Sequence, residues 1–224
     1  MKVALITGTS KGLGYELTKH YLSSGSIVIG ISRSASSIND PNYYHCATDI
    51  TKESSVEKLR VFVKSLSISK IEIVFNNAGV GSHGFHLSEV DPQEVLNQVN
   101  LHCVGALRVI TAIQGYISNS KIVNITSRLG SIRQNERGDF SMREFSYSYR
   151  IGKCAQNMLS LCMANDPELS GATVISINPG LLKTASGSND ANHTAEDGAA
   201  AIVKLVDTVQ NSGIYHAFEE EAVY

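Results

Sequence analysis

Tyr149 and Lys153 are the residues with the clearest potential for proton-transfer chemistry. Lys153 follows Tyr149 by four positions in SYSYRIGKCAQNML, and Ser127 closes the run KIVNITS further upstream. Residues four apart share one face of a helix, so in a helix the lysine ammonium can approach the tyrosine phenol and a ligand beside it. The neighbouring Tyr147 has Ile151 at the matching position, so the spacing selects Tyr149.

The chemistry of a phenol explains why the lysine matters. A phenol with an ordinary pKa of about 10 exchanges protons poorly near neutral pH. Lowering that pKa by about three pH units takes about 4 kcal/mol, which one cation about 4 Å away supplies at an effective dielectric of about 20. We therefore expect Lys153 to activate Tyr149, and Ser127 to hold a reacting carbonyl oxygen through its hydroxyl. The same Tyr and Lys spacing also occurs by chance in amphipathic helices, so this interpretation depends on the rest of the chain.

A glycine-rich loop follows the first apolar run. Residues 7–14 read TGTSKGLG, with the glycines in GxxxGxG spacing. Glycines permit a tight turn and close approach of a ligand to the backbone, and the N-terminus of the following helix offers free N–H groups to a pyrophosphate. We predict a nucleotide phosphate site, the alternative being a plain strand-to-helix turn. The residues expected to form it are Gly8, Ser10, Lys11, Gly12, Leu13 and Gly14.

The end of the second predicted strand bears on which nucleotide binds. Residues 30–34 read GISRS and lack the carboxylate that receives the ribose 2′-hydroxyl in NAD sites. Arg33 and Ser32, with Lys11 nearby, would instead bind the 2′-phosphate of NADP through charge-assisted hydrogen bonds. NADP (NADPH) is therefore the predicted cofactor. The alternative is that Arg33 and Lys11 are solvated surface cations.

Composition limits the classes of protein to consider. With 224 residues and 42% hydrophobic content, the chain can bury one core, and we expect residues 1–224 to form a single domain. A formal charge of −2 gives no field that would attract nucleic acid or an anionic membrane, and no apolar run is long enough to cross a bilayer. The four cysteines lack CxxC spacing and are expected to be small buried residues in a reducing, cytoplasmic protein.

Short apolar runs alternate with segments of helical spacing along the chain. The apolar runs predict strands at 2–7, 26–32, 43–47, 71–75, 121–126, 172–177 and 213–218. Between them, helices are predicted at 12–24, 51–66, 92–117, 148–164 and 195–210. The alternation predicts an α/β, doubly wound Rossmann fold with a seven-stranded, mainly parallel sheet covered by helices on both faces. Ligands of such sheets bind at the carboxyl ends of the strands.

Four motifs occur in an order typical of one enzyme family. They are TGTSKGLG at 7–14, NNAG at 76–79, Ser127 with Tyr149 and Lys153, and NPG at 178–180. Over nearly its whole length the chain thus resembles the short-chain dehydrogenase/reductase family. Within that family, RLGSI at 128–132 and the YSYR context resemble the C-factor-like carbonyl reductases.

The resemblance implies roles for residues that spacing alone does not single out. It implies that Asn100 joins Ser127, Tyr149 and Lys153 as a catalytic tetrad, and that it supports a water-linked proton path to the lysine. It also implies that Asp49 meets the adenine amino group, although Asp49 could equally cap the helix that follows it. The further cofactor contacts that it implies are Ile50, Asn76, Ala78, Gly79, Pro179, Gly180, Leu182 and Thr184.

The segment between Ser127 and Tyr149 is longer than the family commonly has, whereas the region after Pro179 is short. We therefore expect a longer loop after Ser127, no bulky lid, and a shallow or open substrate pocket. The expected walls are His83, Phe85, His86, Leu129, parts of 133–146, and Leu182. The HxxH spacing of His83 and His86 lacks the further ligands of a metal site, and no metal is expected.

Together these features favour an NADPH-dependent oxidoreductase that reduces a small-molecule carbonyl, such as an aldehyde, ketone or quinone, with Tyr149 as proton donor. One alternative is an NADP-binding regulatory or signalling protein with little turnover. An NAD-linked alcohol dehydrogenase is a weaker alternative, disfavoured by Ser32 and Arg33. A homodimer or homotetramer that associates through the helices at 92–117 and 148–164 is also expected.

Overall fold

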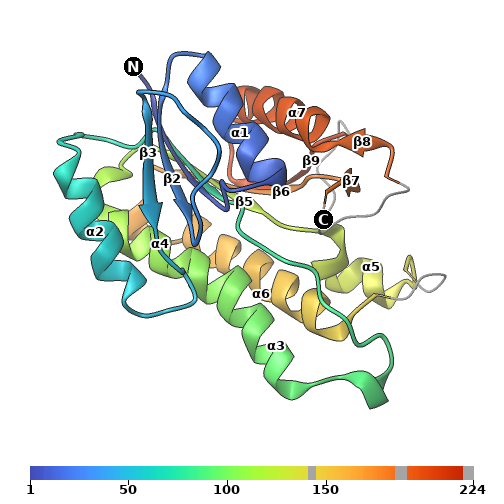
Figure 1. Ribbon diagram of the computed structural model, residues 1–224. Coiled ribbons are helices and arrows are strands. Elements are labelled where there is room, and N and C mark those ends of the chain that lie inside the picture. Colours follow the sequence, from blue (N-terminus) through green and yellow to red (C-terminus); the bar gives the residue numbers. More distant parts are fainter. Residues whose placement is uncertain (141–144, 185–190, 219–224) are drawn as a thin grey trace.

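The computed structural model describes residues 1–140, 145–184 and 191–218, and shows one sheet between two layers of helices (Figure 1). All neighbouring strands of this sheet are parallel, in the order β3-β2-β1-β4-β5-β6-β9. Its strands are β1 (Val3–Thr7), β2 (Ile27–Ser32), β3 (Tyr43–Ala47), β4 (Ile73–Asn76), β5 (Lys121–Ile125), β6 (Thr173–Asn178) and β9 (Gly213–His216). The predicted seven-stranded, doubly wound sheet is confirmed.

Helices cover both faces of the sheet. In Figure 1, α1 and α7 lie on one side, and α2, α4 and α6 lie on the other. The α-helices are α1 (Gly12–Ser23), α2 (Ser55–Ser65), α3 (Pro92–Val99), α4 (Gly105–Ile113), α5 (Ile132–Glu136), α6 (Tyr147–Ala164) and α7 (Ala195–Thr208). Short 3₁₀ turns occur at η1 (Leu87–Glu89), η3 (Gln114–Tyr116), η4 (Arg128–Gly130) and η5 (Pro167–Leu169).

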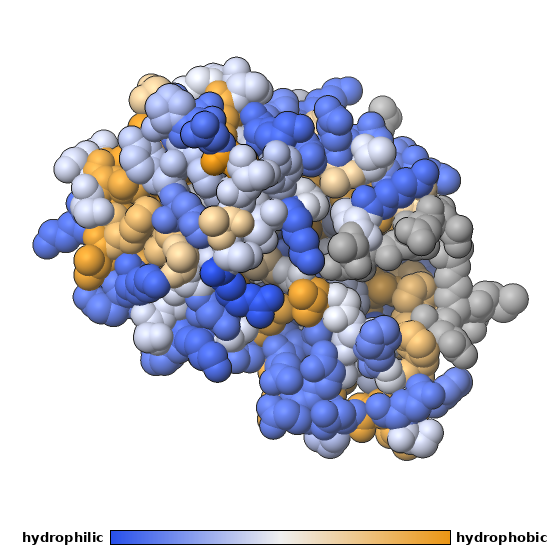
Figure 2. Space-filling view, in the orientation of Figure 1, coloured by the Kyte–Doolittle hydropathy of each residue, from blue (hydrophilic) through white to orange (hydrophobic). Residues whose placement is uncertain are grey.

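Two hydrophobic clusters make up the core, one on each face of the sheet. Side chains alternate along a strand, so Val3 and Leu5 of β1 join one cluster while Ala4 and Ile6 join the other. Every residue of β1 is buried because both faces are covered. Hydrophilic side chains dominate the face of the molecule in Figure 2. No helix in the described ranges has the length and apolar character that a membrane span requires.

The segment predicted as one helix at 92–117 is interrupted. Asp91 caps α3 by accepting a hydrogen bond from the backbone of Gln93 at 2.8 Å. After α3 the chain forms a π-helical turn, η2 (Asn100–Val104), in which the Gly105 N–H donates to the Asn100 carbonyl. A π turn inserts a residue into the helical register and changes which side chains face inward. Here His102 is the buried residue of the turn.

Other local differences have simple causes. The second helix begins at Ser55 rather than near 51, because Asp49 accepts hydrogen bonds from the backbone and hydroxyl of Thr51 and holds a turn there. The region 128–146 contains α5, and only 141–144 of it lie outside the described residues. A small parallel pair, β7 (Leu182–Lys183) with β8 (His193–Thr194), was not expected from the sequence.

Candidate active site

A cavity of about 840 Å³ opens at the carboxyl ends of the central strands. The direction of strand order changes between β1 and β4, which is where ligands of open parallel sheets bind. The cavity contains most of the predicted site. The predicted residues that line it are Gly8, Ser10, Lys11, Gly12, Leu13, Ser32, Arg33, Asp49, Ile50, Ala78, Gly79, Ser127, Tyr149, Lys153, Pro179, Gly180, Leu182 and Thr184. Gly14, Asn76 and Asn100 are the predicted site residues outside that lining.

The glycine loop has the backbone that an anionic ligand needs. Gly8 and Gly12 adopt positive φ angles of 77° and 61°, which glycine tolerates without strain. Lys11 is the N-cap of α1, its side chain makes no capping hydrogen bond, and the first turn of α1 has no acidic residue. The first N–H groups of a 12-residue helix therefore meet the cavity without a competing carboxylate. This arrangement fits the pyrophosphate of a dinucleotide.

Gly14 supports the loop from behind. A Cβ at this position would lie 2.3 Å from the Gly8 carbonyl oxygen and 2.4 Å from Nδ2 of Asn77. Asn77 in turn donates to the Thr7 carbonyl at 2.8 Å, and Oγ1 of Thr7 accepts from the backbone of Asn77 and Ala78. These bonds tie the end of β4 to the end of β1. Gly14 thus allows α1 to pack closely on the loop.

Arg33 and Asp49 lie at the part of the cavity formed by β2 and β3. Burial alone would raise the pKa of Asp49, but hydrogen bonds from Thr51 and the charges of Arg33 and Lys52 lower it. Ser32 donates to the Ser34 carbonyl at 2.7 Å, so its hydroxyl is already engaged. Arg33 is exposed and lines the cavity. Its guanidinium is therefore the group here that best suits an anionic ligand.

Asn76 does not line the cavity. It is buried, and its Nδ2 donates to Oδ1 of Asn124 at 2.8 Å. Asn124 donates in turn to the hydroxyl of Ser160 at 2.8 Å. In this structure Asn76 therefore links β4 to β5 and α6 from within the core.

Ser127, Tyr149 and Lys153 come together from two elements. Ser127 follows β5 and caps η4 by accepting a hydrogen bond from the backbone of Leu129 at 3.2 Å. Tyr149 lies in the first turn of α6 and forms a hydrogen bond with Ser127. Lys153 lies one turn further along, with Nζ 5.7 Å from the centre of the Tyr149 ring. The structure therefore brings together the three residues that the sequence singled out.

The electrostatics of the pair differ from the sequence-based expectation. Burial raises the pKa of Tyr149 to about 12, and the hydrogen bond with Ser127 opposes this only in part. Burial lowers the pKa of Lys153 to about 7, and its Nζ donates to the Ile125 carbonyl at 2.7 Å and to Gln156 at 3.0 Å. The expected lowering of the Tyr149 pKa by Lys153 is absent because burial penalises both charged forms. At neutral pH Tyr149 therefore holds its proton.

The Asn100 side chain is not brought to this group. Its Nδ2 donates to the Thr51 carbonyl at 3.1 Å, and its Oδ1 accepts from Arg108 at 2.8 Å. Arg108 also contacts Glu53 at 3.2 Å, so Asn100 joins η2 to the turn before α2. The geometry gives no support to the tetrad role that the family resemblance implies for the Asn100 amide.

Sequence reasoning missed His102 instead. His102 is buried and lines the cavity, and its ring centre lies 5.5 Å from that of Tyr149 in an edge-on arrangement. The one signal in the sequence is the four-residue spacing from Gln98, whose Oε1 lies 2.9 Å from Nε2 of His102. The π turn that directs His102 inward has no pattern of its own in the sequence.

The predicted pocket walls are found only in part. Phe85, Leu129 and Leu182 line the cavity, and so do Phe145 and Ser146 from the segment 133–146. His83 and His86 are not in the lining. Across the described ranges, no group of three or more histidine, cysteine, aspartate or glutamate side chains is placed to hold a metal ion.

Comparisons with known proteins agree with this geometry. Residues 2–195 match the family model for short-chain dehydrogenases. The chain is 30% identical to 1-hydroxy-2-glutathionyl-2-methyl-3-butene dehydrogenase of a Rhodococcus species over 95% of each chain. It is 27% identical to the C-signal of Myxococcus xanthus over 72% of this chain and 96% of the relative.

Solved structures show the same fold. The carbonyl reductase Sniffer of D. melanogaster matches with a TM-score of 0.88 at 22% identity, and NADPH-bound carbonyl reductase from chicken fatty liver matches with 0.87 at 18%; each match covers 100% of both chains. At these low identities the two solved structures show a shared fold and nothing about function. The family model, in contrast, matches most of the chain and shows the family. The glycine loop, the NNAG turn and the Ser-Tyr-Lys group meet in one cavity. Because the family model matches most of its length, this chain belongs to the short-chain dehydrogenase family of oxidoreductases.

Proposed function

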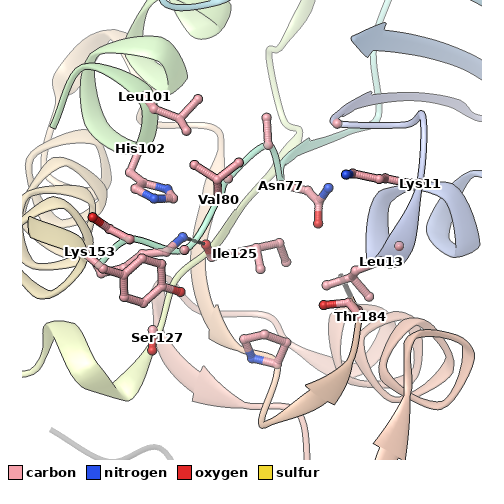
Figure 3. Close-up of a pocket in the computed structure, with 18 of the residues that line it drawn as sticks. Lys11, Leu13, Asn77, Val80, Leu101, His102, Ile125, Ser127, Lys153 and Thr184 are labelled. Atoms are coloured by element: carbon pink, nitrogen blue, oxygen red, sulfur yellow. Dashed lines mark hydrogen bonds between the residues drawn. The ribbon is translucent and has the colours of Figure 1, made fainter. Parts of the chain in front are cut away.

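We propose that this protein is an NADPH-dependent reductase that converts a carbonyl group of a small molecule into an alcohol. The proposal rests on the observation that different functional residues line the two ends of the cavity. Figure 3 shows Ser127 and Lys153 at one end and Lys11, Leu13 and Thr184 at the other. A dinucleotide that spans this cavity places its phosphates at the glycine loop and its reactive ring near the proton donor.

The preference for NADP rests on charge. The loop and the N-terminus of α1 would hold the pyrophosphate, and exposed Arg33 and Lys11 would bind a 2′-phosphate. A relative supports this choice: the chain is 27% identical over 82% of its length to NADPH-dependent pterin aldehyde reductase of Arabidopsis thaliana. An NAD-linked alcohol dehydrogenase remains the weaker alternative, because no carboxylate ends β2.

The residues at the reactive end divide the chemistry among them. The chemistry that a bound reduced nicotinamide supplies is hydride transfer to the carbonyl carbon. The Ser127 hydroxyl donates a hydrogen bond to the carbonyl oxygen and thereby orients the substrate. Tyr149 keeps its proton, with a pKa of about 12, until charge develops on that oxygen, and then donates it. The Lys153 ammonium, 5.7 Å from the ring, stabilises the tyrosinate that remains.

The test is consumption of NADPH, and separately NADH, over a panel of aldehydes, ketones and quinones, with Tyr149→Phe as the matched variant. We expect turnover that prefers NADPH and is lost in Tyr149→Phe. Turnover that survives this substitution would contradict the assigned mechanism.

Similarity to the C-signal of Myxococcus xanthus favours one second candidate, a nucleotide-binding signalling protein with little turnover. The intact Ser127, Tyr149 and Lys153 group argues against it. Saturable NADPH binding with no reduction of any carbonyl in the panel would favour this candidate. Reduction at rates typical of enzymes would exclude it as the main role.

Self-association and location complete the proposal. Large apolar side chains are exposed on α4 and α6, among them Leu107, Ile151, Met158 and Leu161. We expect this face to join two copies of the chain, as a homodimer or within a homotetramer, which light scattering would detect. All four cysteines are unpaired in the part of the chain that the structure describes, in keeping with a reducing, cytoplasmic location. The expectation that all four are buried is wrong, because Cys103 and Cys154 are half-buried and Cys162 is exposed.

A further inference from the structure

Two aromatic residues of β3 form hydrogen bonds with the loops at the nucleotide end of the cavity. β3 is the edge strand of the sheet and pairs with β2 (Figure 1). The register places Tyr43 beside Val28 and His45 beside Gly30, so the two rings lie on one face of the sheet. They are stacked, with 6.3 Å between ring centres and 18° between ring planes. Neither ring lines the cavity itself.

His45 contacts the turn that carries Arg33. The hydroxyl oxygen of Ser32 lies 2.7 Å from the Ser34 carbonyl oxygen, which can only accept, so the single hydroxyl hydrogen is donated there. The same hydroxyl oxygen lies 2.9 Å from Nε2 of His45 and has no second hydrogen to give. Nε2 of His45 is therefore the donor of this hydrogen bond, whichever state the other ring nitrogen has.

This bond acts on the part of the cavity proposed for a 2′-phosphate. Ser32, Arg33 and Ser34 all line the cavity, and Arg33 and Ser34 are exposed. Arg33 lies between the two residues that the Ser32 hydroxyl joins, so the direction of its side chain depends on that turn. By donating to Ser32, His45 holds the turn from β3. An ordered turn binds a ligand more tightly than a mobile one, because less conformational freedom is lost on binding.

Tyr43 contacts the glycine loop instead. Its hydroxyl lies 2.8 Å from Oγ1 of Thr9, which is buried in that loop. Gly30 makes this contact possible, since a Cβ there would lie 2.3 Å from the Tyr43 hydroxyl. The Gly8 N–H also donates to the Ile31 carbonyl at 2.7 Å and joins the loop to β2. Tyr43 thus holds the loop proposed for the pyrophosphate, a group that NADPH and NADH share.

The two contacts are nearly separate. Oγ1 of Thr9 lies 3.5 Å from the hydroxyl oxygen of Ser32, which is the limit of hydrogen-bond distance and therefore a weak link. Each ring accordingly acts mainly on its own loop.

We infer that His45 is a positioning residue for recognition of the 2′-phosphate of NADPH, and that Tyr43 is a positioning residue for the pyrophosphate. The inference rests on the proposed NADPH-dependent function and deepens it. Loss of the His45 donor weakens binding of NADPH selectively, whereas loss of the Tyr43 hydroxyl weakens binding of NADPH and NADH by the same factor. General loosening of the edge strand would not divide the two cofactors in this way.

The test for His45 compares His45→Leu with His45→Gln in binding titrations. Glutamine keeps an N–H donor near the position of Nε2, whereas leucine is of similar size and has no donor. We expect His45→Leu to raise Kd for NADPH about two- to tenfold, which is the loss of one hydrogen bond, while Kd for NADH stays within about twofold. His45→Gln should recover most of the affinity for NADPH.

Tyr43→Phe tests the second ring, because it keeps the ring and removes only the hydroxyl. We expect Kd for NADPH and Kd for NADH to rise by the same factor, about two- to tenfold. Tyr44→Phe is the matched control, since Tyr44 lies on the same strand, is exposed and points to the opposite face. Neither Kd should change in Tyr44→Phe.

A readout without turnover separates this inference from the proposed function. Adenosine 2′,5′-bisphosphate and AMP differ in the 2′-phosphate and need no carbonyl substrate. The unmodified protein should bind the bisphosphate more tightly, and His45→Leu should reduce that difference. If no carbonyl is reduced, the reductase function fails while these affinities still decide the role of His45. Equal binding of the two nucleotides by the unmodified protein would contradict both the preference for NADP and the inference.

Three other results would overturn the inference. They are an equal change of Kd for NADPH and NADH in His45→Leu, no rescue in His45→Gln, and a loss in Tyr43→Phe that is confined to NADPH. If His45→Leu fails to fold, His45→Phe serves in its place, because it keeps a ring beside Tyr43 and removes the donor. The same selective rise in Kd for NADPH is expected of His45→Phe.

Discussion

At the level of single residues, burial affects the pKa values of the site more than attraction between charged groups does. Burial raises the pKa of Tyr149 to about 12 and lowers the pKa of Lys153 to about 7, so both shifts favour the neutral side chain. A protonated phenol beside a lysine that titrates near neutral pH suits proton donation to an oxygen in reduction. The hydrogen bond with Ser127 lowers the pKa of Tyr149 but does not offset the effect of burial.

Lys153→Met should stabilise the protein, and more so at low pH. The pKa of Lys153 falls from 10.5 to about 7 on folding, so the unfolded chain binds the proton more tightly. The resulting cost, on the order of 5 kcal/mol at most, is complete below pH 7 and disappears as the pH rises towards 10.5. Urea unfolding at pH 6 and pH 9 should therefore show a larger gain for Lys153→Met at pH 6. An equal gain in the free energy of unfolding at pH 6 and pH 9 would mean that burial does not lower the pKa of Lys153.

Single residues also show what the sequence could and could not predict. Ser127, Tyr149 and Lys153 were found because their chemistry and spacing are recognisable without a structure. His102 was missed because a histidine in a helical pattern reads as an ordinary core residue. Asn100 was assigned by resemblance, whereas its amide bonds to Thr51 and Arg108.

At the level of elements, hydrophobic periodicity predicted all strands of the main sheet and the five long helical segments. It worked because a parallel sheet with two covered faces needs continuous apolar strands. Periodicity did not predict the π turn η2, the turn at Asp49 or the pair β7–β8. The hydrogen bonds of these elements depend on tertiary contacts rather than on a repeating apolar pattern. These irregular elements lie next to the cavity, where the chain departs from regular structure.

Gly14→Ala should disrupt the phosphate loop. Its Cβ would meet the Gly8 carbonyl oxygen at 2.3 Å, a backbone atom that cannot move without shifting the loop. We expect weaker NADPH binding by about 5- to 150-fold and a lower Tm, because overpacking costs about 1–3 kcal/mol. Gly115→Ala is the control, since a Cβ there has no neighbour within 4 Å. Unchanged NADPH binding in a fluorescence titration of Gly14→Ala would contradict the assigned loop geometry.

At the level of the whole molecule, topology brings the site together from distant parts of the chain. The glycine loop follows β1, the NNAG turn follows β4, and Ser127 follows β5, all at the same edge of the sheet. This convergence could be predicted from strand order alone. The form of the pocket walls could not, because Phe85 and Phe145 reach the cavity from irregular segments while His83 and His86 do not.

Arg33→Ala should change the choice of cofactor. Loss of a charge-assisted hydrogen bond to a 2′-phosphate costs about 1.5–3 kcal/mol, which lowers kcat/KM for NADPH by about 10- to 150-fold. NADH lacks that phosphate, so its kcat/KM should barely change. Arg60→Ala, which removes an exposed arginine paired with Glu57 on α2, is the control. An equal loss with both cofactors would mean that Arg33 does not read the 2′-phosphate.

The most direct test of the central claim is a single-turnover measurement with Tyr149→Phe, in which NADPH binding and hydride transfer to a carbonyl substrate are followed in the same sample. The account predicts that Tyr149→Phe binds NADPH about as tightly as the unmodified protein, and that its hydride transfer falls by about 10²-fold or more because the proton donor is gone. Hydride transfer at the original rate, with NADPH bound, would show that Tyr149 is not the acid of this reaction.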